Sequence, residues 1–265
     1  MFLYNFFDYK HHIENFASDM FSIPHIIYII LAYISVLLIL IFCKNIKKKT
    51  VENYIKVLSV LMPIFEITKI SWESFWDIKE GYGLNLEGLI PIYTCSLFIY
   101  MLLFAAWSKN DKIKRMSLSF LSTIGFFAGG IGVIACNGLN FYPFFTFGAF
   151  YSLIFHYLMF FTGAFLLGSR YVSLDWSDIY ISWIPIVILS FLAVPINYIL
   201  GSDYMQTYSA SGVPLMESLA SICAKYNIRF VFTLVMICAY LVLSTIVVSI
   251  YKLVYKIKEK KGATI

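Results

Sequence analysis

The sequence contains few charged residues. Asp, Glu, Lys and Arg make up 13% of its 265 residues, whereas hydrophobic residues make up 60%. A typical soluble domain has about 25% charged residues. A water-soluble fold of this length could not cover so much apolar surface, and the mean hydropathy is +0.80. The composition therefore predicts an integral membrane protein whose apolar surface is covered by lipid.

The sequence also lacks the common motifs of enzymes and metal sites. It has no phosphate-binding glycine loop, no HExxH pair and no GxSxG nucleophile turn. None of the five cysteines forms a CxxC pair, which argues against a disulfide framework or a zinc site. The net charge of +5 comes from lysines clustered in short loops. We therefore expect no metal, no cofactor and no nucleic-acid partner.

Seven apolar segments approach the length of about 20 residues that a membrane-spanning helix needs. They are His25–Cys43, Tyr54–Ile70, Leu89–Trp107, Met116–Cys136, Phe145–Leu167, Tyr180–Leu200 and Ile228–Tyr251. The second is the weakest, because it contains Lys56, Glu66 and Lys69. We expect one all-α membrane domain over residues 1–265, a bundle of seven transmembrane helices. A short segment, residues 1–24, precedes the bundle, and a basic tail, residues 252–265, follows it.

The loops on the two sides of this predicted bundle differ in charge. One side has Lys44, Lys47, Lys48, Lys49, Lys109, Lys112, Lys114, Arg115, Arg170, Lys252, Lys256, Lys258, Lys260 and Lys261. The other side has Lys10, Lys79 and Lys225. Because cytoplasmic loops are enriched in Lys and Arg, we expect the C-terminus in the cytoplasm and the N-terminus outside. The chain would then be a multi-pass protein of the cell membrane.

Small residues predict where one helix contacts another. Gly125, Gly129 and Gly132 lie in the fourth segment, and glycine lets two helix backbones approach closely in a membrane. The tryptophans lie near the predicted helix ends, where amphipathic rings prefer to sit.

A few polar residues lie inside the apolar segments, where they are costly and so are candidates for function. Glu66 and Lys69 are three residues apart on one face of the second segment, where they form either a mutual ion pair or the wall of a cavity. Cys95 follows Pro91 at the start of the third segment, although most membrane cysteines only pack.

His156 and Asn197 complete this set of candidates. His156 lies in the middle of the fifth segment and Asn197 near the end of the sixth, and for both the commoner role is a hydrogen bond to another helix. In the predicted topology both lie in the outer half of the bilayer, at a depth similar to that of Glu66, Lys69 and Cys95. A shared depth predicts one outward-opening polar cavity.

These residues resemble those of the YwaF-like integral membrane proteins of bacteria, which are related to vertebrate transmembrane protein 164. That family has a proline–x–histidine–x–cysteine run at the start of a membrane helix. It is similar to Pro91, Tyr93 and Cys95 here, with tyrosine in place of histidine. The family's later histidine and its glutamate on the second helix match His156 and Glu66. Its run after the sixth helix resembles Asn197, Gly201, Asp203, Tyr204 and Met205, with aspartate replacing asparagine at 203.

The resemblance implies an activity, because the vertebrate relative is regarded as a phospholipid acyltransferase with an essential cysteine and histidine. It implies that Cys95 is a nucleophile and His156 its base, acting on a phospholipid or lysophospholipid ester by transfer or hydrolysis of the acyl group. Membrane lipids would be its partners. The residues expected around the substrate are Glu66, Lys69, Tyr93, Asn197, Asp203 and Tyr204.

Two other interpretations remain open. The chain is a transporter or small-ligand-binding protein if Glu66, Lys69, His156 and Asn197 line a pathway. Seven helices without an inverted repeat match common secondary transporters poorly. The chain is a non-catalytic membrane scaffold if its polar residues only hold helices together.

Overall fold

The computed structural model describes residues 5–10, 18–210 and 214–262, and within these residues it contains helices and no strand. The prediction of an all-α fold is therefore confirmed for the described chain. The α-helices are α1 (Ile23–Phe42), α2 (Lys48–Lys79), α3 (Leu86–Leu89), α4 (Leu97–Trp107), α5 (Asp111–Ser122), α6 (Ile124–Ile134), α7 (Phe147–Gly168), α8 (Asp178–Leu200), α9 (Pro214–Lys225) and α10 (Arg229–Gly262). Three short 3-10 helices are η2 (Cys43–Asn45), η3 (Asn137–Asn140) and η4 (Tyr204–Gln206).

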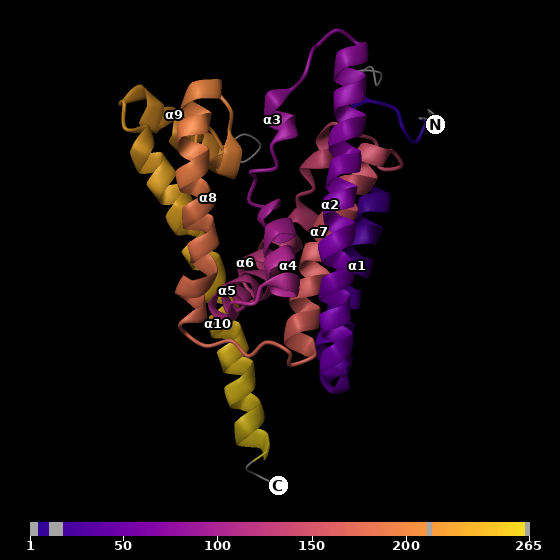
Figure 1. Ribbon diagram of the computed structural model, residues 1–265, viewed down its shortest axis with the longest axis vertical. Coiled ribbons are helices and arrows are strands. Elements are labelled where there is room, and N and C mark those ends of the chain that lie inside the picture. The colour runs from indigo at the N-terminus through magenta and orange to yellow at the C-terminus, as the bar shows by residue number, and fades with distance from the viewer. Residues whose placement is uncertain (1–4, 11–17, 211–213, 263–265) are drawn as a thin grey trace.

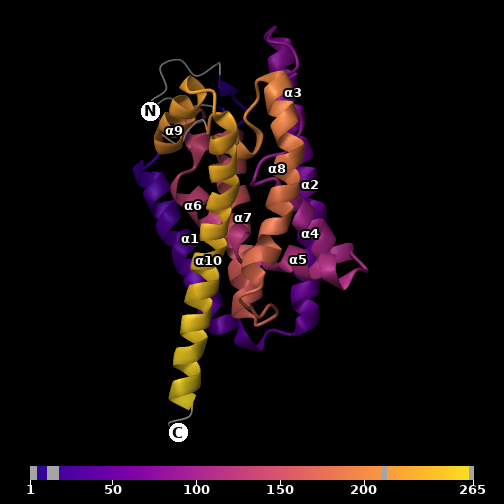
Figure 2. The same cartoon turned by 90° about the vertical axis from the view of Figure 1, so that its left-hand side faces the viewer.

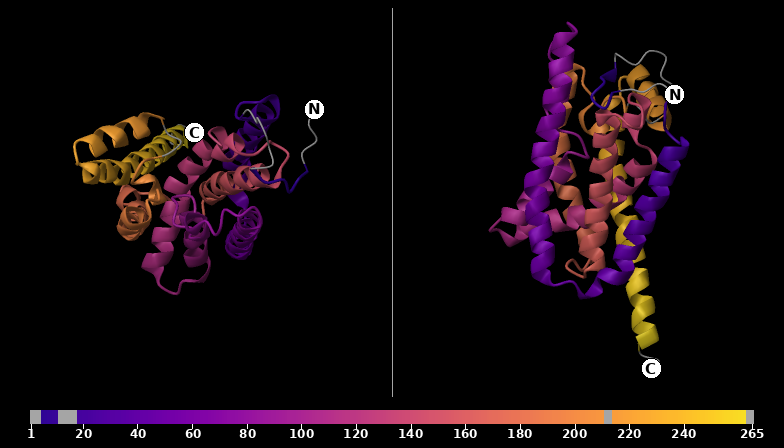
Figure 3. Two further views of the ribbon diagram at one scale, coloured as in Figure 1. Left: turned by 90° about the horizontal axis from the view of Figure 1, so that it is seen from above. Right: turned by 90° about the vertical axis from the view of Figure 1, so that its right-hand side faces the viewer.

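The helices run back and forth between two ends of an elongated bundle (Figure 1). We call the end that holds the turn at 43–47 and the loop at 169–177 the lower end, and the opposite one the upper end. α1 begins towards the upper end, and α10 ends below the rest of the bundle. The connection between α4 and α5 projects from one side (Figure 2), and the view from above shows α8, α9 and α10 grouped together (Figure 3).

In the described part of the chain, five helical stretches are long and apolar enough to cross a membrane. They are Ile23–Asn45, Asp111–Asn140, Phe147–Gly168, Asp178–Leu200 and Arg229–Val254. They correspond to the first, fourth, fifth, sixth and seventh predicted segments. α2 is long but rich in charged residues, and α4 has only 11 residues. The count of seven spans and the orientation of the termini therefore stay predictions.

The third predicted segment, Leu89–Trp107, was wrong as a continuous helix. α3 ends at Leu89 and α4 begins only at Leu97. The reason is Pro91, because the ring of a proline disfavours the helical conformation in the residue before it. Ile90 is accordingly extended, with φ −104° and ψ 108°. Cys95 therefore lies in a turn that precedes a helix, not in the helix itself.

The fourth predicted segment, Met116–Cys136, is two helices. α5 and α6 meet at Thr123, whose φ of −121° and ψ of −87° are not helical. The Thr123 hydroxyl donates to the carbonyl of Ser119, one turn earlier, at 2.7 Å. The break lets α6 leave α5 at an angle and lie along α7.

Glycines bring α6 against α7, as predicted for Gly129 and Gly132. A Cβ on Gly129 would lie 2.4 Å from the backbone nitrogen of Phe160, and one on Gly132 would lie 2.1 Å from Cδ2 of His156. Both distances are impossible contacts, so the packing requires glycine at these two positions. Gly125 differs, because a Cβ there would lie nearest to Phe120 in the preceding helix, at 3.2 Å.

Two segments outside the predicted membrane helices have a defined structure. The connection between α8 and α10 contains η4 and the helix α9. At the upper end the Tyr9 hydroxyl donates to Asp77 of α2 at 2.5 Å, and its ring lies edge-on to Trp72. Burial, reinforced by Asp77, raises the pKa of the Tyr9 phenol. Residues 5–10 are thus packed on the bundle.

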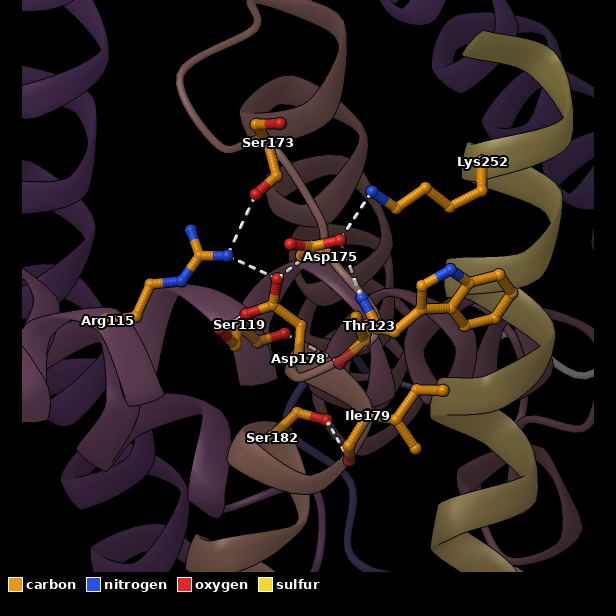
Figure 4. Close-up of polar contacts among 10 residues, drawn as sticks. Arg115, Ser119, Thr123, Ser173, Asp175, Asp178, Ile179, Ser182 and Lys252 are labelled. Carbon is orange, nitrogen blue, oxygen red and sulfur yellow. Dashed lines mark hydrogen bonds and ion pairs between the residues drawn. The ribbon is translucent and has the colours of Figure 1, made fainter. Parts of the chain in front are cut away.

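Two carboxylates, Asp178 and Asp175, connect three helices near the lower end (Figure 4). Asp178, at the start of α8, is completely buried and accepts hydrogen bonds from Arg115 and Ser119 of α5. It also accepts one from the backbone nitrogen of Asp175 at 2.6 Å. Lys252 of α10 reaches Asp175 at 2.7 Å, which lowers the pKa of that carboxyl. We call these five residues the lower junction. The sequence analysis had treated Arg115 and Lys252 only as signals of orientation.

Two lysine–tryptophan pairs lie along α2. The ammonium of Lys56 lies 5.7 Å from the ring centre of Trp107, and Trp107 donates to the hydroxyl of Ser59 at 2.9 Å. Further along the helix, the ammonium of Lys79 lies 4.4 Å from the ring centre of Trp76. Each pair joins a cation to an aromatic face, an attractive arrangement.

Candidate functional site

One cavity collects most of the residues that the sequence analysis selected. Its volume is about 270 Å³, and its lining includes Glu66, Lys69, Tyr93, Cys95 and His156. These side chains come from α2, from the turn before α4 and from α7. We call it the Cys95 cavity. Of the described cysteines, Cys95 is the one that lines it.

The turn that holds Cys95 is fixed by contacts to two helices. The Tyr100 hydroxyl, on α4, donates to the carbonyl of Pro91 at 3.2 Å. The Thr94 hydroxyl lies 2.6 Å from the hydroxyl of Tyr240 on α10. The backbone nitrogen of Phe98 donates to the carbonyl of Cys95 at 3.0 Å. The non-helical segment after Pro91 therefore has a defined shape, and the thiol has a defined place.

The backbone around the thiol offers hydrogen-bond donors. Within the described chain, the N–H groups of Cys95 and Ser96 have no backbone acceptor. They precede the first turn of α4, and the N-terminal end of a helix favours negative charge. Glu66 and Lys69, of opposite charge, line the same cavity.

The orientation of His156 is set by its own helix and by α6. Its Nδ1 lies 2.8 Å from the carbonyl oxygen of Ser152, one turn earlier. Because a carbonyl only accepts, Nδ1 carries the proton of the neutral ring and Nε2 keeps a lone pair. No hydrogen bond to Nε2 is present among the described residues. The ring fits where Gly132 has no side chain. His156 thus presents a basic nitrogen that its helix leaves unused.

Glu66 and Lys69 do not pair with each other, so the mutual ion pair considered from the sequence was wrong. Lys69 forms an ion pair with Glu73 at 2.6 Å, and Glu66 accepts a hydrogen bond from Tyr151 of α7. Glu73 also lines the cavity. It lies four residues after Lys69, a spacing at which helical side chains meet, so the sequence did contain a signal for this pair.

The other three predicted residues lie outside the cavity lining. Asn197 is buried, and its side-chain oxygen accepts from the backbone nitrogen of Tyr204 at 2.8 Å. The Tyr204 hydroxyl donates to the carbonyl of Glu87 at 3.0 Å. Asp203 accepts from the backbone nitrogen of Tyr208 at 2.9 Å. These contacts shape the turn after α8.

This turn reaches the cavity through Tyr93. The Tyr93 ring lies 5.3 Å from that of Tyr204, and its hydroxyl donates to the side chain of Glu87 at 3.1 Å. The same Glu87 oxygen accepts from the backbone nitrogen of Asp203 at 3.0 Å. The turn that contains Asp203 and Tyr204, and that is bonded to Asn197, therefore supports one wall of the cavity indirectly, through Tyr93. Their role in contacting a substrate stays a prediction.

Tyr151 and Ser152 also line the cavity, and neither was predicted from the sequence. Ser152 lies four residues before His156 on the same face of α7, which is the signal that could have found it. No cluster of three His, Cys, Asp or Glu side chains able to hold a metal ion occurs in the described part of the chain.

Comparison with known proteins identifies the family. No curated protein sequence and no solved structure matches the chain. A family model described as the TMEM164 family matches residues 20–248, which include every residue that lines the Cys95 cavity. This membrane protein therefore belongs to the TMEM164 family.

Proposed function

We propose that this protein transfers acyl groups between phospholipids, with Cys95 as the nucleophile and His156 as the general base. The observation that carries the proposal is that both residues line one cavity while Nδ1 of His156 is already bonded to Ser152. A histidine held in this way has its Nε2 lone pair available to take a proton. The family resemblance of the proline–cysteine turn and of the later histidine supports the same pair.

The proposed reaction has two halves. In the first, His156 takes the thiol proton and the sulfur of Cys95 attacks the carbonyl carbon of a phospholipid ester. A C–S bond forms, the C–O bond breaks, and the proton on His156 goes to the leaving lysophospholipid oxygen. In the second, the hydroxyl of another lysophospholipid gives its proton to His156 and attacks the thioester, which returns the thiol. Water in place of that hydroxyl gives hydrolysis.

The cavity supplies groups for both halves. In this proposal the N–H groups of Cys95 and Ser96, which have no backbone acceptor in the described chain, receive the negative oxygen that develops at the ester carbon, and Lys69 adds a positive charge. Tyr93 lines the same cavity as Cys95. In this proposal the chain crosses the cell membrane seven times and the cavity faces the outer leaflet.

A second candidate is a binding site or transport pathway for a small polar ligand. The observation in its favour is that three charged side chains, Glu66, Lys69 and Glu73, line the cavity. This candidate requires neither the thiol nor the Nε2 lone pair.

Mass spectrometry of the acylated protein distinguishes the two. Purified protein would be incubated in detergent with a phospholipid that carries a labelled acyl chain, and hydroxylamine-sensitive labels would be located on the chain. We expect a thioester at Cys95 that is lost in Cys95→Ser and falls about 100-fold or more in His156→Gln, the scale of general-base catalysis.

The matched control is Cys238→Ser, which removes an exposed cysteine of α10 and should keep full labelling. Labelling of Cys95 that is indifferent to His156→Gln would overturn the proposed base. Absence of any thioester, together with lipid composition unchanged by the protein, would reject acyl transfer and favour the small-ligand candidate.

A further inference from the structure

A second concave site lies between α1, α6, α7 and α10. It is a groove of about 440 Å³ whose walls include Phe126, Ile131, Phe160 and Ile250. Figure 2 faces this side of the bundle, with α1 and α10 on either side of α6. We call it the lower groove, because it ends at the lower end of the bundle. It shares no lining residue with the Cys95 cavity.

Two cations stand at the lower end of this apolar groove. Lys44 lies in η2, after α1, and Arg170 lies in the loop after α7. Neither forms an ion pair with a carboxylate in the described part of the chain. The nearby carboxylates Asp175 and Asp178 are bonded instead to Lys252 and Arg115. The two positive charges that line the groove are thus uncompensated by the described chain.

The backbone of Arg170 belongs to the turn that ends α7. Arg170 has a φ of +57°, in the left-handed region, where glycine is the usual residue after a helix. Its N–H donates to the carbonyl of Leu167 at 3.1 Å, and the N–H of Val172 donates to that of Leu166 at 3.2 Å. The turn therefore holds the base of the Arg170 side chain at the lower end of the groove.

Arg170 also lines a wider pocket on the same end of the bundle. That pocket measures about 480 Å³ and includes Lys48, Lys114 and Asp111. Its positive charges exceed its negative ones. The apolar groove therefore opens, at Arg170, onto a surface where an anion is favoured.

We propose that the lower groove binds one anionic phospholipid, with an acyl chain along the apolar walls and the phosphate between Lys44 and Arg170. Other apolar faces of the bundle also contact lipid, but this groove combines a concave apolar wall with uncompensated cations at one end. A neutral phospholipid gains the apolar contact but less of the electrostatic one. The site is independent of the acyl-transfer proposal, because it lies on other residues.

The first test measures lipid preference. Protein would be presented with equimolar phosphatidylglycerol and phosphatidylcholine in mixed micelles, and bound lipid would be counted by native mass spectrometry. We expect a preference for phosphatidylglycerol that falls about fivefold for each lost cation, in Lys44→Gln and in Arg170→Gly. Arg170→Gly is chosen because glycine accepts the positive φ, so the variant keeps its fold. Lys225→Gln, on the exposed surface of α9, is the matched control and should change nothing.

The second test fills the groove. Ile131 is 46% exposed and lines the groove, whereas Ile188 of α8 is 55% exposed and does not. Ile131→Trp should abolish the bound phosphatidylglycerol, and Ile188→Trp should keep it. Binding that survives Ile131→Trp but is displaced by inorganic phosphate would show a phosphate site without a lipid chain and overturn the proposal. Binding unchanged in Arg170→Gly and Ile131→Trp alike would show ordinary surrounding lipid and overturn it too.

Discussion

The Cys95 cavity and the lower junction both place ionisable side chains among apolar helices, yet they use them differently. In the lower junction both oxygens of Asp178 accept hydrogen bonds, one from Ser119 and the other from Arg115 and the backbone of Asp175. In the Cys95 cavity, Nε2 of His156 has no hydrogen-bond partner in the described chain. Both oxygens of the Asp178 carboxylate are thus hydrogen-bonded, whereas the His156 ring keeps one nitrogen without a partner in the described chain.

This contrast separates a structural role from a binding role. A buried charge that loses one of its partners leaves the other unsatisfied, so a saturated site is sensitive to mutation through stability. A site with unused lone pairs and open volume loses little stability when a group is removed, and loses activity instead. The comparison predicts opposite effects of mutation in the two places.

The largest effect is expected at Asp178. Asp178→Ala removes the acceptor of the Ser119 hydroxyl and of the Asp175 N–H, and leaves Arg115 only the carbonyl of Ser173. It should lower the free energy of unfolding by about 3 kcal/mol. Unfolding of the detergent-solubilised protein by a stronger denaturing detergent, followed by circular dichroism, measures it. Asp178→Asn keeps one acceptor oxygen and should lose less. Cys95→Ser should cost under about 1 kcal/mol, and an equal loss from Cys95→Ser and Asp178→Ala would break the comparison.

A smaller effect on stability, with a large effect on activity, is expected at Gly132. Gly132→Ala inserts a methyl group that must displace the His156 ring, since the present distance to Cδ2 would be 2.1 Å. Overpacking of this kind costs about 1–3 kcal/mol. Acylation of Cys95 should also fall, because His156 moves. Gly125→Ala on the same helix is the control, and activity as high in Gly132→Ala as in Gly125→Ala would contradict the placement of His156.

The smallest effect is expected at the exposed edge of the junction. The hydrogen bond from Lys252 lowers the pKa of Asp175 below its ordinary value of 3.8. The contact therefore stabilises the folded state fully at pH values above 3.8. This contribution is lost as the pH falls through the pKa that Asp175 has in the folded state. Asp175→Asn should therefore lower the melting temperature slightly at pH 7, and less at pH 3 or in 1 M salt, which screens the pair. A deficit that is the same in all three conditions would mean that Asp175 acts through packing instead.

Long apolar runs made much of the fold predictable. α1, α7 and α8 lie close to their predicted bounds, because each is a long, mostly apolar run that continues as one helix. The third and fourth segments failed locally. After Pro91 the chain stays non-helical for five more residues, until α4 begins at Leu97, a length that the proline alone does not specify. Thr123 ends α5 without being a recognised helix breaker. The paths of such breaks depend on tertiary contacts, such as those of Thr94 with Tyr240.

The residues that line the cavity were easier to predict from the sequence than the groups to which they are hydrogen-bonded. Depth along helices brought Glu66, Lys69, Cys95 and His156 into one list, and the structure shows them lining one cavity. It was not possible to foresee that Asn197 faces the turn after α8, because rotation about a helix axis is decided by packing. The lower junction was missed because Arg115 and Asp178 are 63 residues apart, and nothing local indicates that they meet.

The two lysine–tryptophan pairs along α2 indicate where the surfaces of a bilayer would cross the bundle. Lys56 and Trp76 are twenty residues apart, about 30 Å along a helix, which equals the thickness of a bilayer's hydrocarbon core. Lysine and tryptophan are the residues that anchor helices at the two lipid–water boundaries. We therefore expect the boundaries to pass near these two pairs. Glu66 then lies close to the midplane of the bilayer, deeper than the outer-half position expected from the sequence. If the acyl-transfer proposal holds, a substrate ester has to move well below its usual level among the headgroups to reach the thiol.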